Sequence, residues 1–70
     1  MQITVNGESR TVEPGTTLAM LVTALSGESG RDPRGIAIER NLEIVPKSEH
    51  ATTVIEEGDR IEVVQFVGGG

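Results

Sequence analysis

Cysteine, tryptophan and tyrosine are absent from this sequence of 70 residues, and Phe66 is its one phenylalanine. A chain without cysteine has no disulfide framework and no thiol nucleophile. Its one histidine, His50, cannot build a structural zinc site, which needs several cysteine and histidine ligands. The core of this small domain must therefore be aliphatic, and the domain lacks the reinforcements that small folds commonly use.

The sequence also has few basic residues and no long apolar run. No stretch approaches the ~20 apolar residues that cross a bilayer, and no signal-peptide pattern is present. Six Lys and Arg against eleven Asp and Glu give a formal net charge of −5. Such a surface repels nucleic acid and anionic membranes but suits a basic protein partner. We therefore expect a cytoplasmic protein with no nucleic-acid partner and no membrane partner.

Alternation of apolar and polar residues predicts strands at both ends of the sequence and in its middle. The dipeptide Asn6-Gly7 separates the first two strands and is typical of a tight β-hairpin turn. Arg40-Asn41 is predicted to form a turn between the third and fourth strands. The predicted strands are residues 2–5, 10–13, 36–39, 43–45 and 61–66.

One helix is predicted after the hairpin, because apolar residues recur there at helical spacing. Thr16 or Thr17 is the expected N-cap, and Ser26-Gly27 the expected end. Residues 26–35 are polar and rich in glycine, and are predicted to form a mobile surface loop. Ser48 is a candidate cap for a helical turn within residues 47–53. The apolar stripe of the helix is Leu18, Leu21, Val22 and Leu25.

The order of these elements predicts an α+β fold, in which one helix packs across one face of a mixed sheet of four or five strands. In such a topology the first and last strands commonly pair in parallel at the centre of the sheet. Residues 1–67 are predicted to form the folded domain, and residues 68–70 a flexible tail.

The glycine run at Gly68, Gly69 and Gly70 is the most informative part of the sequence. Glycine packs no side chain and loses the most backbone freedom on ordering, so this run does not serve stability. It offers a thin main chain that can enter a slot too narrow for any Cβ, with a carboxylate at its end. The alternative is a frayed terminus or a cloning remnant.

The last strand predicts a docking surface beside this tail. If Ile61 and Val63 face the helix, then Glu62, Val64 and Phe66 share the open face of the sheet. Exposed Val64 and Phe66, with Val67 next to the tail, would form an apolar docking patch. A bulge that reverses this phase, or a Phe66 ring folded back on the sheet edge, is the alternative.

The side chains do not assemble a recognisable catalytic group. His50 lies in a polar stretch without a partnered serine, and we expect it to be solvated or to cap a turn. The carboxylates of Glu56, Glu57 and Asp59 surround Gly58 and are expected to belong to a turn. We therefore expect the chain not to be an enzyme and to bind no metal.

Several segments, taken in order, resemble one known family. They are MQITVNG at residues 1–7, Thr17-Leu18, IAIERN at 36–41, IVPK at 44–47, EGDRIE at 57–62 and VGGG at 67–70. Together they look like the ThiS family, the small ubiquitin-like sulfur carriers of thiamine biosynthesis. The most specific parts are Gly-Asp-Arg-Ile and the glycine terminus. Leu42 departs from the pattern, since a small or polar residue is expected in its turn. The resemblance implies a β-grasp fold, in agreement with the predicted order of elements.

The resemblance also implies a mechanism. An E1-like adenylyltransferase (ThiF-like) would use ATP to adenylate the carboxylate of Gly70, and a sulfur relay fed by a cysteine desulfurase would convert it to a thiocarboxylate. Thiazole synthase (ThiG-like) would then take the sulfur. Gly68 and Gly69 would thread into the partner's active site. The chain itself would bind no cofactor, because the activating partner uses the ATP.

Other functions fit the same pattern. The sulfur could serve molybdopterin, cysteine or a secondary metabolite, since carriers of these pathways share the fold and a similar tail. A ubiquitin-like protein modifier would be joined to lysines through the same glycine terminus. A plain binding module with an accidental tail is the third alternative.

Overall fold

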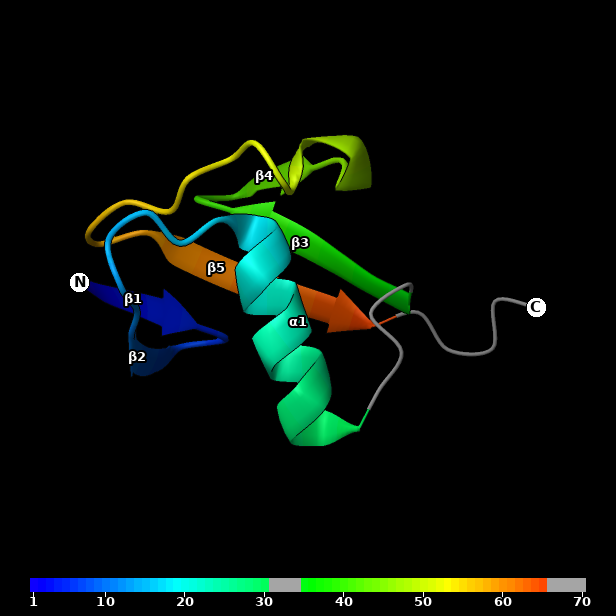
Figure 1. The fold of residues 1–70 in the computed structure, drawn as a ribbon, viewed down its shortest axis with the longest axis horizontal. Coiled ribbons are helices and arrows are strands. Elements are labelled where there is room, and N and C mark those ends of the chain that lie inside the picture. The colour runs from blue at the N-terminus through cyan, green and yellow to red at the C-terminus, as the bar shows by residue number, and fades with distance from the viewer. Residues whose placement is uncertain (31–34, 66–70) are drawn as a thin grey trace.

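The computed structural model describes residues 1–30 and 35–65. It has a five-stranded mixed sheet, in the order β2-β1-β5-β3-β4, with one long helix across one face (Figure 1). The predicted α+β architecture is therefore confirmed. The elements are β1 (Gln2–Val5), β2 (Glu8–Thr11), α1 (Leu18–Ser29), β3 (Ile36–Arg40), β4 (Glu43–Val45), the 3-10 turn η2 (Lys47–Glu49) and β5 (Arg60–Gln65).

The last strand, β5, occupies the centre of the sheet. It pairs in parallel with β1, where Thr4 lies opposite Arg60 and Val5 lies opposite Ile61. On its other side β5 pairs antiparallel with β3 from Arg40 back to Ile36. The predicted central pairing of the first and last strands is thus confirmed. The strand that leads toward the glycine tail is consequently paired with a strand on each side.

The core lies between α1 and one face of the sheet, and it is aliphatic as predicted. Alternate residues of β1, β3 and β5 point to the helix, which supplies its own apolar stripe. Each buried Leu or Ile side chain contributes about 1.5–3 kcal/mol relative to an exposed one. The buried apolar residues are Ile3, Val5, Leu18, Leu21, Val22, Ile36, Ile38, Ile55 and Ile61.

The start of α1 is capped by its own threonine and by a distant segment. The Thr17 hydroxyl accepts a hydrogen bond from the Met20 N–H at 3.2 Å, which makes Thr17 the N-cap. The next orphan donors are satisfied by residues 50–53, because the Leu18 N–H donates to the Thr53 carbonyl and the Ala19 N–H to the His50 carbonyl, both at 3.0 Å. The predicted cap is confirmed.

The helix ends later than its sequence indicates. It continues to Ser29 and stops at Gly30, whose φ of 73° is left-handed and whose N–H donates to the Ser26 carbonyl at 2.8 Å. The predicted end at Ser26-Gly27, and with it the predicted loop over 26–35, is therefore wrong for residues 26–29. A tertiary contact supports the extra turn: Arg10 of β2 donates two hydrogen bonds to the Glu28 carboxylate. Residues 31–34 lie outside the described part of the chain.

The second strand begins earlier than predicted. Asn6 and Gly7 have φ values of 51° and 83°, as a two-residue type I′ hairpin requires. A two-residue turn fixes the register, so Val5 lies opposite Glu8 and β2 runs from Glu8 to Thr11 rather than over residues 10–13. Val12 lies beyond the strand but still packs against the core.

His50 is buried, so the expectation of a solvated side chain is wrong. The residue stands at the C-cap position of η2, where its backbone N–H donates to the Lys47 carbonyl. It is 6% exposed, and its Nε2 lies 2.9 Å from the Val45 carbonyl oxygen. A carbonyl only accepts, so Nε2 carries the proton and donates. The turn η2 folds this residue back against the end of β4. The η2 turn itself has Pro46 at its N-cap position with no side-chain cap, so Ser48 is not the cap that was expected.

Candidate functional site

The predicted site begins at the C-terminal end of β5. Of the predicted site residues, only Val64 lies within the described residues 1–30 and 35–65. The predicted site residues beyond the described range are Phe66, Val67, Gly68, Gly69 and Gly70.

The phase of β5 agrees with the prediction as far as Val64. Ile61 is fully buried under α1 and Val63 packs against the core. Val64 points to the opposite face, is 46% exposed and lies opposite Ala37 of β3. No bulge reverses the strand before this point. The end of β5 therefore presents an apolar side chain on the open face of the sheet.

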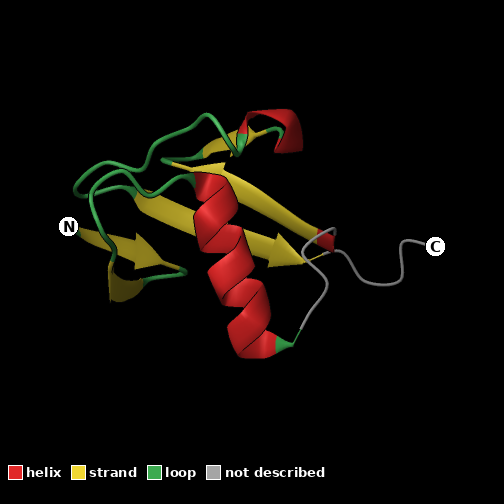
Figure 2. Ribbon diagram, viewed as in Figure 1, coloured by secondary structure: helices red, strands yellow, loops and turns green. Residues whose placement is uncertain are grey.

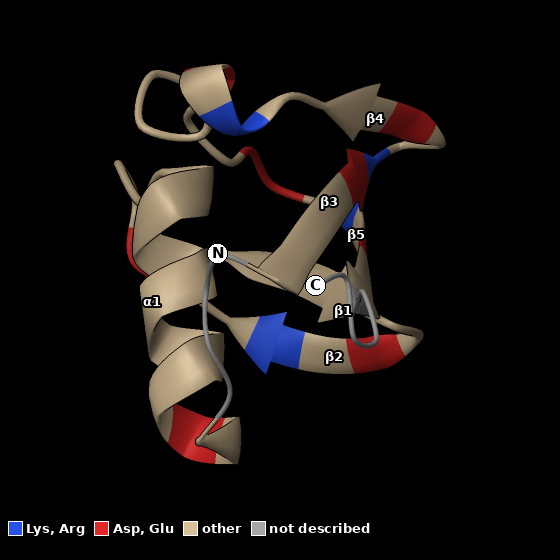
Figure 3. Ribbon diagram, turned by 90° about the vertical axis from the view of Figure 1, so that its right-hand side faces the viewer, with Lys and Arg blue, Asp and Glu red and all other residues tan. Residues whose placement is uncertain are grey.

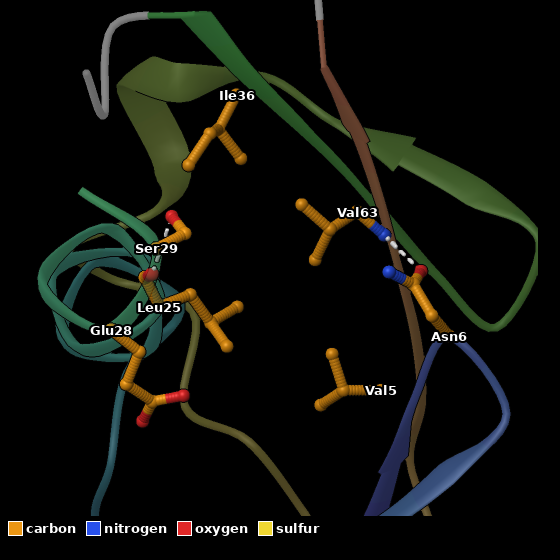
Figure 4. Close-up of a pocket in the computed structure, with 7 residues that line it drawn as sticks. All are labelled: Val5, Asn6, Leu25, Glu28, Ser29, Ile36 and Val63. Atoms are coloured by element: carbon orange, nitrogen blue, oxygen red, sulfur yellow. Dashed lines mark hydrogen bonds between the residues drawn. The ribbon is translucent and has the colours of Figure 1, made fainter. Parts of the chain in front are cut away.

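A side chain from the hairpin turn holds the second half of β5. Strand β1 ends at Val5, which leaves the Val63 N–H without a backbone partner on that side. The Asn6 side chain replaces the missing strand: its Oδ1 accepts from the Val63 N–H at 2.8 Å, as the dashed line in Figure 4 shows. The Asn6 N–H also donates to the Ile61 carbonyl at 2.9 Å. Asn6 thus ties the second half of β5 to the end of β1.

The start of β5 is held by a buried carboxylate. Asp59 is 5% exposed, and it accepts hydrogen bonds from the Glu56 N–H at 2.9 Å, Arg40 Nε at 2.8 Å and Asn41 Nδ2 at 3.1 Å. Burial by itself raises the pKa of Asp59, but these hydrogen bonds and the charge of Arg40 outweigh burial, so the pKa lies below its ordinary value. The predicted turn at residues 56–59 is confirmed, and Asp59 is a structural residue.

The turn between β3 and β4 is tied to the same place. The Asn41 side chain accepts from the Arg60 N–H at 2.9 Å, and the Asn41 N–H donates to the Arg60 carbonyl at 2.8 Å. Asn41 and Leu42 both have positive φ, 51° and 72°. The turn residues are thus Asn41-Leu42, one position later than predicted. Leu42 is strained there, since β-carbon-bearing residues other than Asn and Asp rarely adopt this conformation.

The open face of the sheet is divided into two parts. Over β1 and β2 it is neutral and polar, because Gln2 bridges Ser9 and Thr11 by hydrogen bonds of 2.9 Å. Over β3, β4 and β5 it is mixed apolar and acidic, with Arg60 as a cation at the start of β5. This second area, named here the open-face patch, consists of Ala37, Glu39, Ile44, Glu62 and Val64. Figure 3 shows α1 on one side of the sheet and no described helix on the other.

A groove lies on the covered side of the sheet, between the last turns of α1 and β5. Its volume is about 400 Å³, and Figure 4 shows the Val63, Leu25 and Ile36 side chains around it. Polar atoms enter its lining from Asn6 and Glu28 at the rim. Within the described residues no group of His, Cys, Asp or Glu is arranged to hold a metal ion. No helix in that part of the chain is long and apolar enough to span a membrane.

The ThiS family model matches residues 3–70, which is nearly the whole sequence. The chain belongs to the ThiS family. A solved relative of the family, the thiamine biosynthesis protein (ThiS) from Geobacter metallireducens, superposes over all of both chains with a TM-score of 0.80 and 29% identity. The five-stranded sheet with its single long helix is thus the β-grasp fold of this family, as the sequence resemblance implied.

Two other ThiS-like sequences are parts of longer proteins. A thiazole synthase from Paramagnetospirillum magneticum is 49% identical over the 70 residues, and one from Magnetococcus marinus is 43% identical. The match covers 100% of this chain but only 20% of each of those proteins. A segment similar to this whole chain is therefore present within the length of each of these thiazole synthases.

The residues that fix the two ends of β5 are not evident from the sequence. Asp59 was assigned to a turn, but its pairing with Arg40 depends on a sheet register that the sequence does not state. The facing of Glu39 and Glu62 depends on that same register. The Asn6 side-chain contact to Val63 joins residues 57 positions apart. Local signals existed for the turns that contain Asn6 and Asp59, but not for the contacts that these side chains make.

Proposed function

We propose that this protein is a sulfur carrier of thiamine biosynthesis and that the carboxylate of Gly70 is the group that holds the sulfur. The observation that carries the proposal is the family match through residue 70, which includes the glycine tail. The fold supports it, because the central strand β5 leads directly toward that tail. The proposal requires Gly70 to be the last residue of the working protein.

The chemistry follows from the poor reactivity of a carboxylate. A carboxylate oxygen of Gly70 attacks the α-phosphorus of ATP, and pyrophosphate leaves. Sulfide then attacks the acyl carbon of the adenylate: a C–S bond forms, the C–O bond to phosphate breaks, and AMP leaves. The product is a thiocarboxylate, which is ionised at neutral pH and is a better nucleophile than a carboxylate. Gly68 and Gly69 have no Cβ, so they suit a narrow slot in the partner enzymes.

The proposed partners are the enzymes that perform these steps. They are an E1-like adenylyltransferase (ThiF-like), a sulfur relay with a cysteine desulfurase, and thiazole synthase (ThiG-like). The link to thiazole synthase has independent support, since two proteins of that name include a segment similar to this chain. In this proposal the chain is a co-substrate and not an enzyme, binds no cofactor, and works in the cytoplasm where ATP is available.

Intact-protein mass spectrometry tests the proposal. The full chain is incubated with the adenylyltransferase, ATP and sulfide. We expect a product heavier by the difference between one sulfur and one oxygen atom, and no such product when ATP is left out. A variant that lacks Gly70 is the control and should stay unchanged. An unmodified wild-type mass would contradict the proposal, and isopeptide adducts on lysines of other proteins would indicate a protein modifier.

A further inference from the structure

Two glutamates face each other on the open side of the sheet. Glu39 of β3 lies directly opposite Glu62 of β5 in the antiparallel register. Directly opposed residues have Cβ atoms about 4.5–5.5 Å apart, and like charges there destabilise a sheet. Both side chains are half-buried, and within the described residues neither accepts a hydrogen bond or forms an ion pair. The free protein therefore keeps a repulsive pair at the centre of an exposed face.

Apolar side chains surround this pair. Ile44 of β4 lies opposite Glu39 in the same row, and Val64 lies opposite Ala37 in the next row. Ile44 is 74% exposed and Val64 is 46% exposed. The one cation on this side of β5, Arg60, precedes Glu62 by two residues and forms no ion pair with a described carboxylate. The open-face patch is thus an acidic centre with an apolar border.

We propose that the open-face patch docks onto thiazole synthase, through an arginine of that enzyme inserted between Glu39 and Glu62. This inference rests on the proposed function. The planar guanidinium has donors for two carboxylates at once, and a lysine ammonium does not match that geometry. Ile44 and Val64 then contact apolar side chains around the arginine. The choice of enzyme follows from the relatives, in which a segment like this chain and thiazole synthase share one protein.

The Glu39–Glu62 pair should affect the stability of the free protein and the affinity for thiazole synthase in opposite directions. An arginine between the glutamates removes their repulsion in the complex, whereas the free protein bears it. Neutralising one glutamate should therefore stabilise the free protein and weaken the complex. A residue with a purely structural role would move both quantities in the same direction. The opposite signs are the distinctive prediction of this inference.

The experiment compares Glu39→Gln, Glu62→Gln and the double variant with Glu43→Gln. Glu43 lies on β4 opposite Arg40 and so points to the other face of the sheet, which makes it a control of equal charge. We expect each patch variant to raise the melting temperature by about 1–5 °C. We expect affinity for thiazole synthase, by calorimetry, to fall about tenfold for each glutamate, with a weaker salt dependence. Glu43→Gln removes a carboxylate directly opposite Arg40, so it should not raise the melting temperature, and it should leave the affinity unchanged.

Turnover separates docking from sulfur chemistry. With the carrier supplied as thiocarboxylate, the patch variants should raise KM for the carrier and leave kcat unchanged. Wild-type affinity in the double variant, or equal losses in Glu43→Gln, would overturn the docking site while thiocarboxylate formation still supports the proposed function. The docking site would also be overturned if the patch variants lost affinity for the adenylyltransferase alone and kept wild-type affinity for thiazole synthase. A wild-type chain that never acquires sulfur would contradict the proposed function, and this inference with it.

Discussion

The two faces of the sheet are built for different purposes. The covered face, which α1 crosses in Figure 2, carries the apolar residues of β1, β3 and β5. The open face carries polar, acidic and exposed apolar residues. Most of the free energy of folding must come from the covered face, since burial of apolar surface is the main favourable contribution. The open face is then available for partners, because changes there cost little stability.

The largest loss of stability is expected from truncating a buried side chain on the covered face. Leu21 is buried in the stripe of α1, so Leu21→Ala should lower the free energy of unfolding by about 2–5 kcal/mol. Ile44→Ala removes an aliphatic side chain of the same size from the open face and should cost less than about 0.5 kcal/mol. Urea unfolding measures both. Similar losses in the two variants would contradict the division between the faces.

The next effect concerns the buried carboxylate at the start of β5. Asp59→Asn keeps the shape but loses charge-assisted hydrogen bonds, and should cost about 1.5–3 kcal/mol near neutral pH. Because the pKa of Asp59 is lower in the folded protein, its contribution is present above the ordinary value of 3.8 and is lost as the pH falls below it. Wild type and Asp59→Asn should therefore converge in stability in acid. A constant gap between them at all pH values would refute this role.

A smaller effect on stability is expected at Leu42, in the turn between β3 and β4. Leu42 is 69% exposed and has a φ of 72°, so its side chain contributes little burial and its backbone is strained. Leu42→Gly should therefore raise the free energy of unfolding by about 0.5–1 kcal/mol. Thermal unfolding measures the gain. Leu25→Gly is the control: it places glycine inside the helix α1, where it should lower the stability of the protein.

The smallest effect is local, at the last turn of α1. Hydrogen bonds from Arg10 lower the pKa of Glu28, and the pair joins β2 to the helix. In Glu28→Gln the amides of residues 27–30 should exchange with solvent faster, while the amides of β5 keep their protection. Hydrogen exchange by NMR resolves the two regions. Faster exchange throughout the chain would show that the pair supports the whole fold.

The sequence predicted those features that depend on local patterns. Alternation identified the strands, the stripe at Leu18 identified the helix, and Asn6-Gly7 identified the hairpin. The predicted end of α1 was wrong because Arg10 of β2 supports the last turn of the helix through Glu28. The predicted exposure of His50 was wrong because the turn η2 folds the side chain back to the Val45 carbonyl, five residues earlier. The exposure of Val64 followed from strand phase, but the facing of Glu39 and Glu62 needs a register between strands far apart in the chain.

The central claim is that the end of this chain carries sulfur and gives it up. The most direct measurement starts from the purified thiocarboxylate form with isotopically labelled sulfur, mixed with thiazole synthase and its other substrates in a single turnover. We expect the label to enter the thiazole and the chain to return to its carboxylate mass. Label retained on the chain while unlabelled thiazole forms would contradict this claim.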